Sequence, residues 1–199
     1  MLEAHALSFA YDKHTLFEDF SLTVEEAERV VLQAPSGFGK TTLCRILAGY
    51  LKPDTGKVLL DNAPLAQKGV CPVQMIMQHP EAAVDPRLRM RETLKEAGEV
   101  PEDLLERFKV NPSWLNRYPH ELSGGELQRI CIVRALTTKP RYLIADELST
   151  MLDAVTQAAI WNALLAEARE QHFGMIVVTH SPALAKRIAT RTVDLCEQQ

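Results

Sequence analysis

The first hydrophobic positions of the chain come in short runs with the spacing of β-strands. Residues 6–9 and 20–24 form two such runs, and a polar turn at residues 12–14 separates them. Short apolar runs bounded by turn residues are typical of strands. We therefore expect an antiparallel β-layer at the beginning of the chain.

Beyond this layer, strand-like and helical patterns alternate. Continuous apolar runs predict buried strands, whereas apolar residues spaced three or four apart predict helices. The predicted strands are residues 30–32, 57–60, 74–77, 142–145 and 175–178, and the predicted helices are residues 40–49 and about 154–171. Strands that alternate with helices indicate an α/β fold with a mostly parallel sheet.

Residues 80–139 interrupt this alternation. The segment is charged and helix-favouring, and prolines at positions 86, 101, 112 and 119 punctuate it. We interpret it as an inserted helical subdomain within a single domain, residues 1–199, whose core consists of residues 1–79 and 140–199.

Composition and charge narrow the class of protein. With 46% hydrophobic residues, the chain can bury one sizeable core. Its formal net charge of -4 gives no general attraction to nucleic acid or anionic lipid, so we expect no nucleic-acid partner. The sequence shows no leader-like beginning and no apolar stretch approaching ~20 residues. Any membrane-spanning helices would therefore come from another chain.

The cysteines give no sign of a metal site or of disulfides. Cys44, Cys71, Cys131 and Cys196 are far apart and form no Cys-x-x-Cys pair. This spacing favours a reducing compartment.

The strongest local motif is APSGFGKTT at residues 34–42, between a predicted strand and a predicted helix. The backbone N–H groups of such a loop can surround phosphate oxygens, while Lys40 reaches the β- and γ-phosphates and Thr41 ligates Mg²⁺. This is a Walker A motif, or P-loop, in which Ala34 replaces the first glycine and loses its positive-φ freedom. An ordinary strand-to-helix turn is the alternative, but it does not account for the Gly-Lys-Thr run. The predicted phosphate-binding residues are Pro35, Ser36, Gly37, Gly39, Lys40, Thr41 and Thr42.

A second motif, RYLIADE at residues 141–147, is an apolar strand that ends in two acids. Ligands of parallel sheets bind beyond the carboxyl ends of the strands, so both acids should face the same crevice as the P-loop. Asp146 suits the Mg²⁺ shell, and Glu147 can polarise an attacking water. Alone, such acids would as readily cap the next helix.

The third motif is LSGGELQR, residues 122–129, which we call the signature segment. Ser123 followed by Glu126 is a capping box that would open a helix. A cap does not require two successive glycines, however. Gly124 and Gly125 expose backbone N–H groups at a helix N-terminus, and with Ser123 they form a second phosphate-binding surface.

The signature segment closely resembles the signature motif of ABC ATPases, and the other elements of that family occur in the expected order over nearly the whole chain. Tyr11 resembles the aromatic residue that stacks on adenine, although a core or turn tyrosine is an equal alternative. Gln78 resembles the glutamine that senses Mg²⁺ and the channel subunit. His180 resembles the histidine that contacts the γ-phosphate, although Ser181 and Pro182 also make a good helix start.

The resemblance implies a P-loop NTPase fold and the hydrolysis of Mg-ATP. Two such subunits would face each other head to tail, as a homodimer or a heterodimer. The P-loop of one subunit and the signature segment of the other would close on each ATP. Residues 150–153 resemble the segment that crosses this interface, and Asp153 alternatively caps the following helix. Glu147, His180 and Gln78 would be the catalytic residues, and Thr41, Gln78 and Asp146 would hold Mg²⁺.

The same resemblance implies a place at a membrane. The expected partners are transmembrane permease subunits and, in an importer, a substrate-binding protein. The chain would lie peripherally on the cytoplasmic face of the inner or plasma membrane. Arg87, Arg89 and Arg91 could dock on a channel subunit or could form a solvated face.

Residues 78–90 and 118–129 resemble the branch that imports peptides, nickel and metallophores. Leu148 stands where the family generally has proline, and the chain ends soon after His180. Both departures leave room for a compact member paired with a larger ATPase. The alternatives are an ABC-type ATPase unconnected with transport, an ATP-operated clamp with low turnover, and a P-loop kinase, which would have no use for the signature segment.

Overall fold

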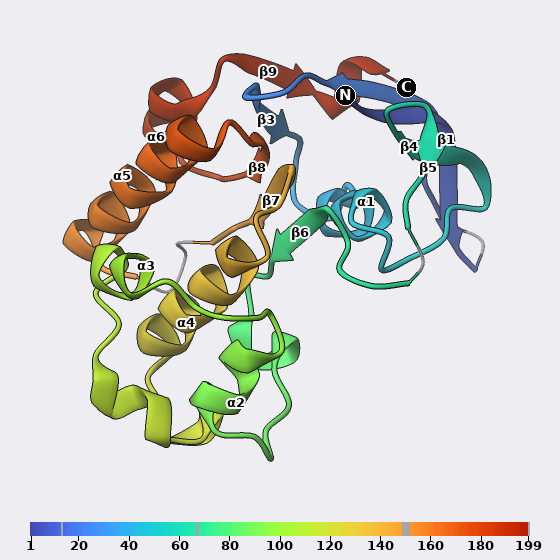
Figure 1. Cartoon of the computed structure of the whole chain (residues 1–199). Helices are drawn as coiled ribbons and strands as arrows, with labels where there is room; N and C mark the ends of the chain where they lie inside the picture. The colour runs from blue at the N-terminus through green and yellow to red at the C-terminus, as the bar shows by residue number, and fades with distance from the viewer. Residues whose placement is uncertain (13, 67, 149–151, 199) are drawn as a thin grey trace.

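The computed structural model describes residues 1–12, 14–66, 68–148 and 152–198. Its first sheet is antiparallel and lies at the upper right of Figure 1. The strand order β2-β1-β4-β5 joins β1 (Leu2–Tyr11), β2 (His14–Val24), β4 (Thr55–Leu60) and β5 (Ala63–Pro64). The predicted N-terminal β-layer is therefore confirmed. The strand predicted at residues 57–60 also belongs to this layer, because β4 pairs with β1.

The second sheet is parallel between all neighbouring strands. Its order β6-β7-β8-β3-β9 joins β6 (Val73–Ile76), β7 (Tyr142–Asp146), β8 (Gly174–Val178), β3 (Arg29–Gln33) and β9 (Arg191–Asp194). β7 and β8 are buried along their whole length, as expected for strands covered on both faces. The sequence analysis missed β9, because the run Arg-Thr-Val-Asp is short and mostly polar.

The parallel sheet separates two hydrophobic clusters, because successive side chains of a strand point to opposite faces. Val30 and Leu32 of β3 pack on the face shared with α1 (Lys40–Leu47) and with the antiparallel sheet. Val31 packs on the opposite face, which α4 (Gly124–Thr137), α5 (Ala154–Gln171) and α6 (Pro182–Ile188) cover. The first helix thus lies between the two sheets (Figure 1).

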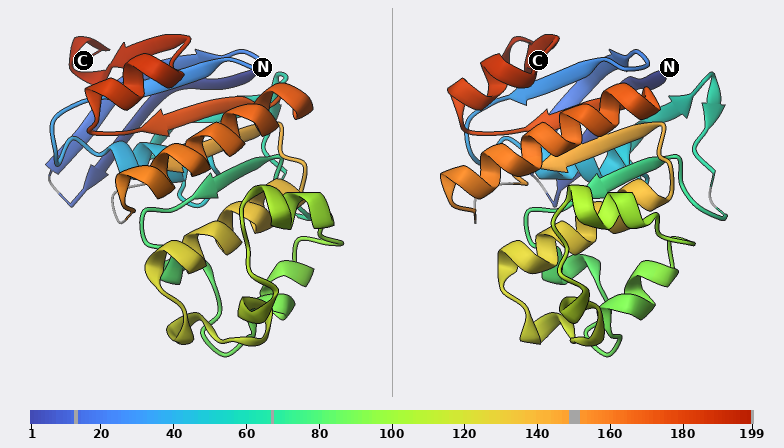
Figure 2. Two further views of the ribbon diagram at one scale, coloured as in Figure 1. Left: turned by 90° about the vertical axis from the view of Figure 1, so that its left-hand side faces the viewer. Right: turned by 60° about the vertical axis from the view of Figure 1, so that its left-hand side comes forward.

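Residues 80–139 are helical, as predicted. They contain α2 (Met90–Lys95), α3 (Glu102–Arg107), α4 and the short 3-10 turns Pro80–Ala83, Pro112–Asn116 and Pro119–Glu121. Figure 2 shows α2 and α3 on the side of the parallel sheet opposite the antiparallel layer. Their buried side chains belong to the same cluster as the sheet residues on that face. The division into a core and a separate subdomain stays a prediction.

Candidate active site

The predicted site residues follow strands that are neighbours in the parallel sheet. The P-loop follows β3, His180 follows β8, Asp146 ends β7, and Gln78 follows β6. The strands are parallel and adjacent in the order β6-β7-β8-β3, so their carboxyl ends lie along one edge. The fold therefore brings together side chains that are far apart in the sequence.

The P-loop takes the backbone conformation that its glycines allow. Gly37 and Gly39 have φ angles of 83° and 90°, in the left-handed region that favours glycine. Ala34 is not among the residues with positive φ. The first position of this loop therefore does not need a glycine's freedom, and the replacement is compatible with the loop.

Lys40 is buried at the start of α1, and its ammonium group is folded onto the loop. Its Nζ donates to the carbonyl oxygens of Ala34 at 2.8 Å and Pro35 at 2.9 Å. Gly39 is the N-cap residue of the helix and supplies no side-chain cap, and the first turn contains no acid. The first N–H groups of α1 have no acceptor within the helix, which makes this end suitable for an anion. Ser36 and Thr41 are exposed here, whereas Thr42 is buried.

Asp146 is the most constrained acid of the site. It is only 1% exposed, and its Oδ1 has no hydrogen-bond partner among the described residues. Burial raises its pKa, and the negative charge of Glu147 adds to that rise. The nearby Thr41 side chain and the charges of Arg45 and Lys40 act in the opposite direction. An unsatisfied carboxylate oxygen beside a threonine hydroxyl fits a Mg²⁺ ion, which prefers oxygen ligands.

Glu147 lies between the two other predicted catalytic residues. Its Oε2 accepts a hydrogen bond from Gln78 Nε2 at 2.9 Å, and its Oε1 lies 2.8 Å from Nε2 of His180. The residue itself has a φ of 48°, which is uncommon outside glycine and often marks a functional constraint. His180 is 50% exposed, so this group of three side chains is open to solvent on one side.

The signature segment forms the predicted capping box at the start of α4. The backbone N–H of Ser123 donates to Glu126 Oε2 at 2.7 Å, and the Glu126 N–H donates to Ser123 Oγ at 3.4 Å. Gly124 and Gly125 are the first residues of the helix. They line a cavity of about 530 Å³ whose described lining residues include none of the P-loop, Asp146, Glu147 or His180. The two predicted phosphate sites are therefore separate within one chain.

Tyr11 ends β1 with its side chain 49% exposed, packed edge-on against Phe9 at 4.9 Å between ring centroids. The hairpin of β1 and β2 lies against the P-loop. Leu16 of β2 is so close to Gly39 that a Cβ added at this glycine would lie 2.9 Å from Leu16 Cδ1. The sequence analysis missed Leu16, since no local signal marks an apolar strand residue as a neighbour of the loop.

The remaining predicted residues lie in or next to the segment before α5. Thr150 and Met151 lie outside the described residues. Asp153 caps α5, because its Oδ1 accepts from the backbone N–H groups of Val155 and Thr156 at 3.0 Å each. Leu148 is 3% exposed and packs into the hydrophobic cluster on the face of the parallel sheet that α4, α5 and α6 cover. Its side chain therefore fills the core at the position where a proline was expected from the resemblance.

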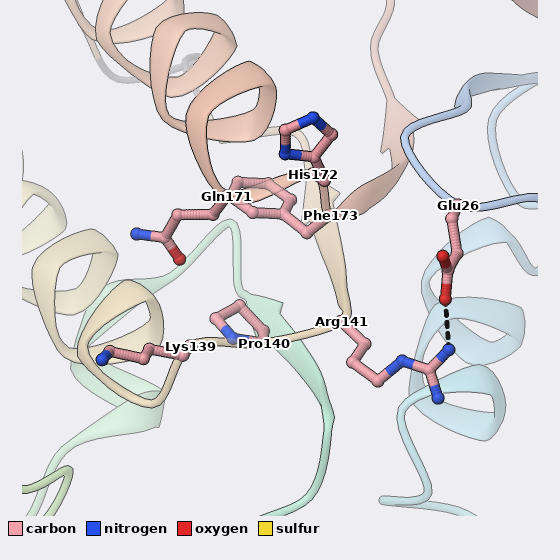
Figure 3. Close-up of a pocket in the computed structure, with 7 residues that line it drawn as sticks. All are labelled: Glu26, Lys139, Pro140, Arg141, Gln171, His172 and Phe173. Carbon is pink, nitrogen blue, oxygen red and sulfur yellow. Dashed lines mark hydrogen bonds and ion pairs between the residues drawn. The ribbon is translucent and has the colours of Figure 1, made fainter.

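A cavity of about 520 Å³ lies at the opposite edge of the parallel sheet, before the strands begin. Figure 3 shows Glu26 and Arg141 pointing toward each other as an ion pair, whereas the side chains of Lys139 and Gln171 extend away from this pair. Among the described residues, no cluster of three or more metal-binding side chains occurs, and none of the helices has the length and apolar character needed to cross a membrane.

Comparison with known proteins places the chain in a family. The family model for the ABC transporter matches residues 17–150, more than half of the chain. A spermidine/putrescine import ATP-binding protein from Chromobacterium violaceum is 36% identical over all of this chain and 59% of its own length. A probable peptide ABC transporter ATP-binding protein from Sinorhizobium fredii is 34% identical over 87% of this chain and 55% of its own length. The chain thus spans little more than half the length of these two relatives.

A nickel import system ATP-binding protein from Staphylococcus aureus is 31% identical over 98% of this chain and 86% of its own length. Among solved structures, a dimeric ATP-binding cassette in a post-hydrolysis state with ADP and phosphate matches with a TM-score of 0.85 and 24% identity. The match covers 98% of this chain and 94% of that one. This structural match supports the fold alone, whereas the family match and the sequence relatives go further: the chain belongs to the ABC transporter family.

Proposed function

We propose that this chain binds Mg-ATP and hydrolyses it to drive an ABC transporter. The observation that carries the proposal is the alignment of four chemical parts along one sheet edge: a phosphate-binding loop, a buried acid with an unsatisfied oxygen, a second acid, and a histidine. Phosphoryl transfer to water needs mainly positioning and charge stabilisation, and these parts supply both.

Each side chain has a proposed role that follows from its surroundings. The ammonium group of Lys40 leaves the carbonyls of Ala34 and Pro35 and binds the β- and γ-phosphates. Thr41, Asp146 and Gln78 would hold Mg²⁺, which would offset phosphate charge when bound. Glu147 orients the attacking water, and His180 donates to the transferring phosphoryl group.

The contacts of Glu147 suggest how idle hydrolysis is restrained. Both of its oxygens already have partners within the chain, Gln78 and His180. Binding of ATP and Mg²⁺ would draw Gln78 and His180 toward the phosphates and would free Glu147 for the water.

The assembly and location are also proposals. The signature segment would serve the nucleotide of a second ATPase subunit, identical or different, because its cavity lies apart from this chain's own P-loop. Residues 80–139 would form the subdomain that transmits closure to permease subunits at the cytoplasmic face of the membrane. We propose an importer of peptides, nickel or metal chelates. We assign no single substrate, because the relatives include a spermidine/putrescine import ATP-binding protein as well as peptide and nickel ones.

The experiment is steady-state ATP hydrolysis by the purified chain, with light scattering to follow its oligomeric state. Glu147→Gln should lower kcat by about 10²-fold or more, because a general base contributes about 10²–10⁴-fold, and it should accumulate an ATP-bound dimer. Glu99→Gln is the matched control and should behave as wild type, because it neutralises an exposed acid within residues 80–139. Normal turnover by Glu147→Gln would refute the assignment of the base. Absence of turnover and dimerisation in wild type would refute a self-sufficient motor.

A further inference from the structure

The cavity at the signature segment is larger than a phosphate site requires. Its volume of about 530 Å³ lies within the range of small-molecule pockets. Gly124 and Gly125 occupy one part of the wall, and their amides can hold a terminal phosphate. Trp114 and Arg129 form another part of the wall. Leu152 and Asp153, just before α5, and Thr156, in the first turn of α5, also border the cavity.

Trp114 is held in place by its own short turn. Its backbone N–H donates to the Asn111 carbonyl at 2.9 Å, and its carbonyl accepts from the N–H of Arg117 at 2.9 Å. The Asn111 side chain caps the same turn by accepting from Ser113 N–H. The indole packs partly against the hydrophobic cluster on the α4, α5 and α6 side of the parallel sheet, and it stays partly exposed at the cavity. A rigid backbone therefore presents a fixed aromatic surface.

Charged side chains lie in the same cavity wall as this ring. Arg129 donates from Nη1 to the Phe108 carbonyl at 2.8 Å, which fixes a positive charge in the wall. The carboxylate of Glu126 is occupied by Ser123. The cation suits the phosphates of a nucleotide, whereas the flat ring of Trp114 suits its heteroaromatic base or ribose, because aromatic side chains stack on bases of any sequence.

We infer that Trp114 contacts the nucleoside of the ATP that a second subunit holds in its P-loop. This inference rests on the proposed function, since it requires two chains that close on ATP. Trp114 would then determine how well the closed pair holds a nucleotide rather than a bare polyphosphate. It would contribute nothing to binding of ATP by a single chain.

The test uses chains that carry Glu147→Gln, so that ATP-bound dimers accumulate. Trp114→Ala should weaken dimerisation in Mg-ATP by about tenfold or more, the scale of one lost base–aromatic stack. Trp114→Phe should restore most of it. Binding of ATP to the dilute, monomeric chain should be unchanged in every variant. Leu115→Ala is the control, because Leu115 lies in the same turn and packs on the core without lining the cavity.

Tryptophan emission gives a second readout. The other tryptophan, Trp161, is 1% exposed in the core. Closure should therefore change the emission of the Glu147→Gln parent but not of its Trp114→Phe variant. If Trp114→Ala dimerises like the parent, or if Leu115→Ala weakens dimerisation equally, Trp114 is structural and the inference is wrong while the proposed function stands. If the parent itself does not dimerise in Mg-ATP, the proposed function fails and takes the inference with it.

Discussion

Replacement of Asp146 by asparagine should stabilise the nucleotide-free protein while it destroys the proposed activity. The carboxylate is 1% exposed, and its Oδ1 lacks a partner among the described residues. An unsatisfied buried polar group costs about 1–3 kcal/mol, and a charged group costs more. Asparagine keeps the shape and still leaves a neutral polar group there, so it removes only the excess cost of the charge, and the free energy of unfolding should rise by about 1 kcal/mol. In a domain of this size, that corresponds to about 2–4 °C in Tm for each kcal/mol.

The stability difference between wild type and Asp146→Asn should depend on pH. The pKa of Asp146 is raised from its ordinary value of 3.8, so the folded chain holds this proton more tightly than the unfolded chain. Stability of wild type therefore falls as the pH rises from 3.8 through the raised pKa, and the full cost is present above it. The advantage of Asp146→Asn should accordingly be largest near neutral pH and should shrink as the pH approaches 4.

Mg-ATP should reverse the order of stability, so that wild type becomes more stable than Asp146→Asn. A ligand that binds only the folded state adds about 2.7 kcal/mol at a concentration of 100 Kd. Mg-ATP should raise the Tm of wild type but should raise that of Asp146→Asn far less. The assay is thermal unfolding at pH 5 to 8 with and without Mg-ATP.

Glu147→Gln is the matched control for this prediction, because it makes the same chemical change in the neighbouring acid. Both carboxylate oxygens of Glu147 have partners, so its neutralisation should bring little or no gain in stability. A nucleotide-free Asp146→Asn protein that is no more stable than wild type, or a gain equal to that of Glu147→Gln, would show that the buried charge is compensated and would refute the reasoning.

Two further predictions concern glycines. Gly39→Ala should weaken ATP binding and should lower the free energy of unfolding by more than the cost of a left-handed backbone, about 1–2 kcal/mol, because its Cβ would also meet Leu16 Cδ1 at 2.9 Å and the less movable Leu16 Cβ at 3.1 Å. Gly37→Ala has a similar φ and nothing within 4 Å, so it should show the backbone cost alone; equal losses in urea unfolding would contradict this account. Gly174→Ala should cost about 1–3 kcal/mol, since its Cβ would lie 2.5 Å from Tyr142 Cε1. Chemical denaturation checks this, and an unchanged midpoint would count against it.

Local features were predictable from the sequence because short-range physics decides them. The P-loop glycines, the capping box of Ser123 and Glu126, and the helix at residues 154–171 each depend on neighbours within a few positions. Their motifs also carried the family resemblance. The polar strand β9 escaped prediction because its pairing with β3, rather than its own pattern, makes it a strand.

Long-range pairing alone decided how these parts meet. The order β6-β7-β8-β3 brings Gln78 and His180 to opposite oxygens of Glu147, although Gln78 is 69 residues away in the chain. Tertiary packing likewise set Leu16 against the P-loop and left Trp114 at the wall of the signature cavity. The sequence by itself determined which chemical groups the protein carries. Only the folded chain, through strand order and side-chain packing, determined which of them are close enough to act together.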